Sequence, residues 1–122
     1  MVLNPDVIFV GRYRLPPDHI ANGIYLSSSD ARAIGRYLRE LIKILGIKQC
    51  DLVTHLYITK VGLYRILNGM IRSKKSYRFV QLGIHSFSQI NDAKELSEND
   101  RNQCIKLNDA IEELLLKETQ YQ

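Results

Sequence analysis

Residues 46–69 read GIKQCDLVTHLYITKVGLYRILNG, and this stretch determines the fold. Its apolar residues recur at helical spacing in two groups, which are Leu52, Val53 and Leu56, then Leu63, Ile66 and Leu67. Gly46 and Gly69 bound the stretch, and glycine ends helices readily because it adopts the left-handed conformation without steric cost. Helices this short do not bury such stripes alone, so we expect them to pack on each other and on neighbours. The stretch predicts two short helices joined by a tight turn at Ile58.

The second of these helices, over about residues 59–67, has an outward face opposite its apolar stripe. That face carries Thr59, Lys60, Gly62, Tyr64 and Arg65. Cationic and hydrogen-bonding groups on a protruding helix are what recognition of the DNA major groove requires. The pattern therefore predicts a helix-turn-helix motif over residues 47–69.

Over about residues 35–85 the chain resembles the Cro/C1-type (XRE-like) family of helix-turn-helix regulators. The matching residues are Gln49, Leu52-Val53, Ile58-Thr59, Gly62-Leu63 and Asn68-Gly69. Three positions depart from the family pattern: Tyr57 replaces the usual turn glycine, Lys48 replaces a Ser or Thr cap, and Lys60 replaces a common glutamine. The resemblance implies a lambda-repressor-like helical bundle and a repressor-like transcriptional regulator that binds double-stranded DNA.

The resemblance also implies roles for individual residues. The Gln49 position contacts phosphate and braces the recognition helix, the Lys60 and Val61 positions face base edges, and the Asn68 position contacts phosphate. In the family the next loop follows the DNA backbone, and residues 70–76 supply three cations and two serines that suit phosphate contact. The predicted DNA-binding residues are Lys48, Gln49, Thr59, Lys60, Val61, Gly62, Tyr64, Arg65, Asn68, Arg72, Lys74 and Lys75, with Lys60 and Arg65 reading bases.

Charge divides the chain into two parts. Residues 1–90 contain 13 Lys and Arg against 5 Asp and Glu, a net charge of +8, whereas residues 91–122 contain 4 against 8, a net charge of −4. A basic body suits a polyanionic partner, and the acidic tail suits a different task. The alternative function is an antitoxin-type protein, or a partition or replication accessory protein. Such a protein would bind DNA with the motif and a protein partner with the acidic C-terminal helix.

The remaining pattern places the motif inside a mainly α domain over residues 27–96. Residues 1–26 are expected to form an extended arm or a small hairpin, because short β-prone runs at 7–10 and 24–26 flank a turn. Ser27 and Asp30 predict the start of a helix that continues to about residue 45. Ser76 is expected to cap a helix over 77–84, with Arg78 extending the basic strip, and a weak helix is expected over 88–96.

A C-terminal helix is predicted from Ser97 to about Thr119. Its apolar residues follow heptad spacing, and they are Cys104, Leu107, Ile111 and Leu114, with Leu115 alongside. This stripe either covers the domain core or pairs with a second copy. Palindromic half-sites require a twofold protein, so we expect dimerisation through this stripe and a homodimer.

No pattern of catalytic residues stands out. The three histidines lie in unrelated contexts, with His55 expected on a solvated face, and Cys50 and Cys104 lack metal-ligand spacing. The sequence therefore predicts no enzyme, cofactor or metal site. It also predicts a cytoplasmic protein without a membrane segment, because no signal-peptide pattern is evident and no apolar run approaches the ~20 residues that span a bilayer.

Overall fold

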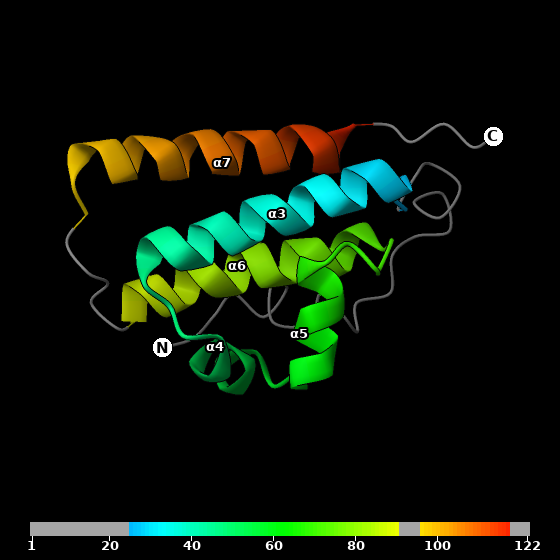
Figure 1. The fold of residues 1–122 in the computed structure, drawn as a ribbon, viewed down its shortest axis with the longest axis horizontal. Coiled ribbons are helices and arrows are strands. Elements are labelled where there is room, and N and C mark those ends of the chain that lie inside the picture. Colours follow the sequence, from blue (N-terminus) through cyan, green and yellow to red (C-terminus); the bar gives the residue numbers. More distant parts are fainter. Residues whose placement is uncertain (1–24, 91–95, 118–122) are drawn as a thin grey trace.

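The computed structural model describes residues 25–90 and 96–117, and in this part of the chain five α-helices form without a strand. The helices are α3 (Ser28–Leu45), α4 (Gln49–Leu56), α5 (Lys60–Leu67), α6 (Lys74–Ile90) and α7 (Glu98–Leu116). In Figure 1, α7, α3 and α6 cross the view in that order, and the short helices α4 and α5 lie on the side away from α7. The expected mainly helical bundle is confirmed.

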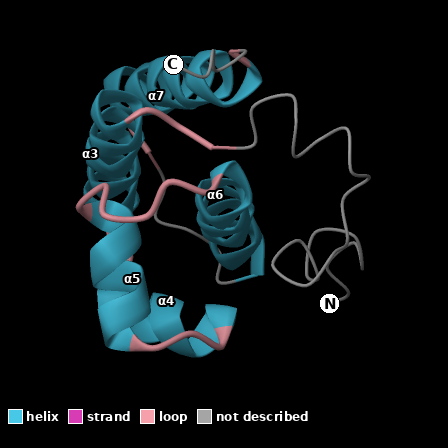
Figure 2. Ribbon diagram, turned by 90° about the vertical axis from the view of Figure 1, so that its right-hand side faces the viewer, coloured by secondary structure: helices cyan, strands magenta, loops and turns pink. Residues whose placement is uncertain are grey.

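Helix α3 is the centre of the bundle and contacts α5, α6 and α7. It begins where predicted, because the Ser27 hydroxyl accepts a hydrogen bond from the Asp30 backbone N–H at 3.1 Å. It ends at Gly46, whose φ of 68° is left-handed. Its inward residues are fully buried, and they include Ala31, Ile34 and Leu38. Helix α3 therefore provides the surface on which α5, α6 and α7 pack (Figure 2).

The two short helices occupy the predicted stretch, and both predicted apolar stripes are buried. The Thr59 hydroxyl caps α5 by accepting a hydrogen bond from the Gly62 N–H at 2.9 Å. The chain reverses between the helices at Tyr57, which has φ 56° and ψ 41°. Tyr57 is the one non-glycine residue with positive φ among those the structure describes. The turn therefore keeps a left-handed conformation although its residue is not glycine.

Tyr57→Gly is expected to raise the free energy of unfolding by up to about 1 kcal/mol. A side chain in the left-handed region is sterically strained, whereas glycine is not, although glycine gains entropy in the unfolded chain. The Tyr57 side chain is 95% exposed, so its removal sacrifices almost no packing. Urea unfolding of both proteins measures the difference. A variant clearly less stable than the native chain would show that the tyrosine is held by contacts that outweigh the strain.

Helix α6 is longer than the helix expected over 77–84, because it runs from Lys74 to Ile90. The weak helix expected over 88–96 falls mostly on residues 91–95, which lie outside the described residues. Helical spacing of apolar residues continues through it, at Tyr77, Val80, Ile84 and Phe87. Gly83 does not end the helix: a Cβ there would overlap the Leu56 side chain, so the glycine permits close packing of α6 on α4. Ser76 is therefore inside the helix and does not cap it.

The segment before α3 is fixed to the chain between α5 and α6. Tyr25 and Ser73 form an isolated antiparallel bridge, and the Leu26 N–H donates to the Arg72 carbonyl oxygen at 2.7 Å. Leu26 itself is fully buried. The expected N-terminal arm or hairpin falls almost entirely on residues 1–24, which lie outside the described residues.

Helix α7 covers α3 with the stripe that was expected to form a dimer. Leu107, Ile111 and Leu115 are at most 7% exposed, and Cys104 and Leu114 pack half-buried against the same core. The helix ends at Leu116, before the expected Thr119. Heptad spacing of apolar residues is expected whether the stripe packs on the same chain or on a second copy. In this structure the stripe packs on α3 of the same chain. The structure therefore favours the alternative in which this stripe covers the domain core, and the homodimer stays a prediction.

A polar cluster joins α6 to α7 beside this core. The Arg78 guanidinium makes a two-pronged contact with the Glu112 carboxylate, and its second nitrogen donates to Oε2 at 3.1 Å. The hydrogen bond from Arg78 lowers the pKa of Glu112. Arg78 also donates to the buried Gln81, whose amide donates to Asn108. Arg78 therefore connects two helices and does not extend a basic strip.

The outward face of α7 carries both signs of charge, with Glu98, Asp109 and Glu113 exposed beside Arg101 and Lys106. This mixture is typical of a solvated helix surface. Within residues 25–90 and 96–117, none of the helices is long and apolar enough to span a bilayer.

Candidate nucleic-acid interface

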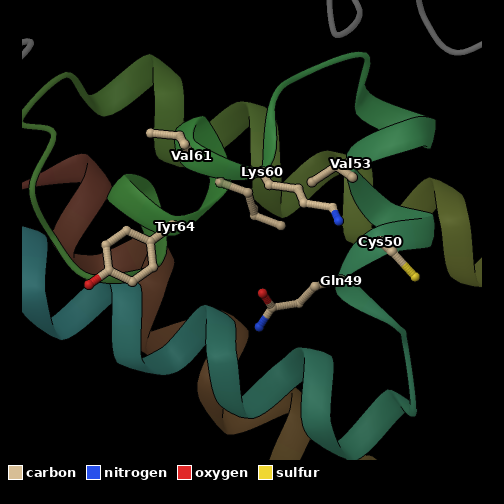
Figure 3. Close-up of a pocket in the computed structure, with 7 residues that line it drawn as sticks. Gln49, Cys50, Val53, Lys60, Val61 and Tyr64 are labelled. Carbon is tan, nitrogen blue, oxygen red and sulfur yellow. The ribbon is translucent and has the colours of Figure 1, made fainter.

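Helices α4 and α5 enclose a surface groove of about 480 Å³. It is lined by Gln49, Cys50, Val53, Lys60, Val61, Leu63 and Tyr64. Figure 3 shows that the Lys60 side chain extends from α5 toward Cys50 and Val53 of α4, while Gln49 projects into the same space. The structure therefore brings together Gln49 and Lys60, which lie eleven positions apart in the sequence.

The outer face of α5 is open. Lys60, Val61, Tyr64 and Arg65 are exposed, whereas Leu63, Ile66 and Leu67 on the opposite face are buried. The two apolar members of the open face are unusually accessible for their type, with Val61 58% and Tyr64 59% exposed. This face thus combines two cations with two side chains that have large apolar surfaces.

Three further predicted residues shape the ends of these helices. Lys48 precedes α4 without a side-chain cap and is exposed. Thr59 caps α5, and its hydroxyl is already an acceptor for Gly62. The Asn68 amide donates to the Tyr64 carbonyl oxygen at 2.8 Å and closes the last turn of α5. Thr59 and Asn68 therefore fix both ends of the helix that carries the open face.

The basic segment after α5 is not the extended loop that was expected. Arg72 donates from Nε to the Leu26 carbonyl oxygen at 2.7 Å, and Lys74 donates from Nζ to the Lys117 carbonyl oxygen at 2.6 Å. Lys117 in turn pairs with Asp30 at 3.4 Å. Lys74 and Lys75 belong to the first turn of α6, and Lys75 is half-buried. Arg72 and Lys74 therefore hold the fold together where α3 and α6 begin and α7 ends, away from the groove.

Sequence reasoning missed Cys50, Val53 and Leu63 as groove residues. Gln49 and Val53 lie one helical turn apart, and this spacing places them on the same face of α4. That spacing was the signal that could have identified the α4 wall of the groove. On α3, the side chains of Arg32, Arg36, Arg39 and Lys43 form an exposed row.

His55 is not on a solvated face, so that prediction is wrong. Its Nε2 lies 2.7 Å from the Ser86 Oγ, and its ring meets Phe87 edge-on with centroids 5.5 Å apart. The Ser86 hydroxyl donates its hydrogen to the Gly83 carbonyl oxygen, so His55 is the donor in the bond between them. Partial burial lowers the pKa of His55. A long-range contact between α4 and α6, invisible in local sequence, causes the difference.

The lowered pKa of His55 predicts a loss of stability in mild acid. The unfolded chain takes up a proton near the ordinary value of 6.5, whereas folded His55 resists protonation, so the unfolded state binds more protons. The free energy of unfolding should be constant well above pH 6.5 and should fall as the pH drops through that value. Urea unfolding between about pH 8 and pH 5 measures it.

His55→Gln is the matched variant, because the glutamine amide can donate to Ser86 but does not titrate. It should flatten the profile in this range. Glu112 does not mask the effect: its lowered pKa means that its contribution is lost only in stronger acid, below 4.5. An unchanged acid sensitivity in the variant would contradict the assignment to His55.

The described residues do not form a metal-binding cluster. Across the two described ranges, no three His, Cys, Asp or Glu residues lie close enough to hold a metal ion. Cys50 is exposed in the groove, and Cys104 is half-buried with a pKa raised by burial.

Comparisons of the chain with known protein families, with curated proteins and with solved structures gave no match. Function is therefore inferred from the geometry of α4 and α5, from charge, and from the resemblance of residues 35–85.

Proposed function

We propose that this chain is a sequence-specific, repressor-like transcriptional regulator that binds double-stranded DNA. In this proposal α4 and α5 form a helix-turn-helix motif of the Cro/C1 type, and α5 enters the major groove. The observation that carries the proposal is the open face of α5, where Lys60, Val61, Tyr64 and Arg65 stand exposed beside Gln49 of α4.

The dimensions of this face suit the proposal. An α-helix with its side chains is about 10–12 Å in diameter, and the B-DNA major groove, about 12 Å wide, admits one such helix. Lys60 and Arg65 present cationic donors, which favour the O6 and N7 acceptors of guanine. Gln49, which lines the same groove as Lys60, would contact phosphate beside them and brace α5.

The charge around α5 also favours a polyanion. The exposed cations of α3 form a row, and the Arg32 backbone packs against Gly69 at the end of α5. Phosphate contacts of this kind supply affinity and salt dependence rather than sequence preference. Arg72 and Lys74 contribute less than the sequence indicated, because donors of both are used within the chain.

The proposed functional unit is a homodimer on two half-sites about one helical turn (~34 Å) apart. Because the heptad stripe of α7 is buried against α3, the second copy would contact a different surface.

Titration of a fluorescent duplex at increasing salt tests whether the chain binds DNA at all. We expect binding at about 50 mM salt and a linear fall of log K with log salt concentration, with a slope set by the number of phosphate contacts. Absence of binding at that salt, in a protein shown to be folded, would contradict the proposal.

A further inference from the structure

We propose that Val61 recognises the 5-methyl group of a thymine, so that the DNA site contains a thymine in the half-site that α5 contacts. The inference rests on the proposed function and specifies the base composition of its target.

Val61 is unusual among the valines of the described residues. It is 58% exposed, whereas Val53 is 9% exposed and Val80 is fully buried. Its side chain has no donor or acceptor, so it gains nothing from water and forms no hydrogen bond with DNA. Val61 therefore contributes little to packing within the chain and leaves an apolar surface open on α5.

The surroundings of Val61 leave it accessible to a flat surface. It is the second residue of α5, lies on the open face of that helix and borders the groove between α4 and α5. The next residue is Gly62, and a Cβ built there would meet only the Thr59 hydroxyl, at 3.1 Å. A base edge can therefore approach α5 closely beside Val61.

The groups displayed in the major groove indicate which one Val61 would contact. Its edges display hydrogen-bond donors and acceptors and a single kind of apolar group, the thymine C5-methyl. A valine discriminates between base pairs there only through this methyl group. Tyr64, three residues further along and 59% exposed, lies on the same helical face and extends the apolar surface. Lys60 and Arg65 favour guanine, so the half-site is expected to combine guanine with thymine.

A chemical double-mutant cycle tests the inference. After the preferred site has been selected from random duplexes, each thymine is replaced singly by deoxyuridine, which removes the methyl group and leaves base pairing intact. For the native protein, at least one replacement should weaken binding about fourfold, the loss expected for one buried methyl-sized group. For Val61→Ala, whose shorter side chain retains one methyl group, the difference in affinity between the same two duplexes should be clearly smaller. The two changes should therefore not be additive.

Ile105→Ala is the matched control, because Ile105 is also an exposed aliphatic residue, 53% accessible, but lies on α7. It should keep the native sensitivity to deoxyuridine. The inference is overturned if no thymine is sensitive, or if Val61→Ala keeps the full loss while remaining folded. A selection that enriches no site would instead refute the proposed function itself, and the inference with it.

Discussion

Lys60→Ala should weaken binding to the selected DNA site by about 1–3 kcal/mol, or roughly 5- to 150-fold, while binding to random DNA falls only slightly. Lys60 is the first residue of α5, is exposed, and extends across the groove toward α4. The lost contact is a cationic donor on a base edge, which random DNA does not satisfy. Arg65→Ala should behave in the same way, because Arg65 lies on the same open face.

The expected loss of DNA affinity in Lys60→Ala would not arise from unfolding of the protein. A cation in the first turn of a helix opposes the helix dipole, and α5 has no acidic residue there to offset it. Lys60→Ala should therefore leave the free energy of unfolding unchanged or raise it by a few tenths of a kcal/mol. Competition binding on both DNAs, with urea unfolding of each variant, separates the two effects.

Two controls sharpen the comparison. Lys106→Ala removes an exposed cation from α7 and should change neither binding constant appreciably. Lys75→Ala tests the predicted phosphate contact and should weaken both DNAs alike while reducing the salt slope by about 1. Equal losses on selected and random DNA from Lys60→Ala and Arg65→Ala would refute base recognition by these residues.

Gly35→Ala should be strongly destabilising, with a loss of about 3 kcal/mol or more in the free energy of unfolding. A Cβ at this position would lie 2.5 Å from the Leu67 carbonyl oxygen and 2.9 Å from its carbon. These are backbone atoms at the end of α5, so no side chain can rotate away. Helices α3 and α5 would have to separate, and DNA affinity should fall together with stability.

Gly62→Ala is the matched control, since both glycines lie within helices. At Gly62 the added methyl would meet only the Thr59 hydroxyl, at 3.1 Å. Alanine also has the higher helix propensity, by about 1 kcal/mol, so the stability should remain within about that amount of the native value. Urea unfolding of the two variants in parallel measures the contrast. Similar losses in both would show that α3 and α5 do not pack this closely.

The ends of α3 and α5 could be predicted from residues that act locally. Ser27, Gly46 and Gly69 each act within a few residues, so the limits of α3 and α5 could be read directly. Helix α6 has no such signal at Gly83, where contact with Leu56 explains the glycine. Its length depends on tertiary packing, and the local pattern does not contain that information.

Three side chains have partners within the chain that the sequence did not reveal, and the cause is the same for each. His55, Arg78 and Arg72 were interpreted as solvated or DNA-facing, yet each binds a group at least 31 positions away or on another helix. Pairings of that kind are set by the fold. Two residues that line the groove, Gln49 and Lys60, were among the predicted DNA-binding residues, Gln49 through the family resemblance and Lys60 through both the resemblance and the helical pattern.

The most direct test of base recognition by α5 is selection of binding sites from random duplexes with the native protein and with Lys60→Ala in parallel. We predict that the native protein enriches a defined site, as two half-sites about one turn apart, with a fixed guanine in each half-site. The variant should enrich the same site with that guanine relaxed and its other positions kept. An identical site for both proteins, or no enriched site for a folded native protein, would contradict base recognition by α5.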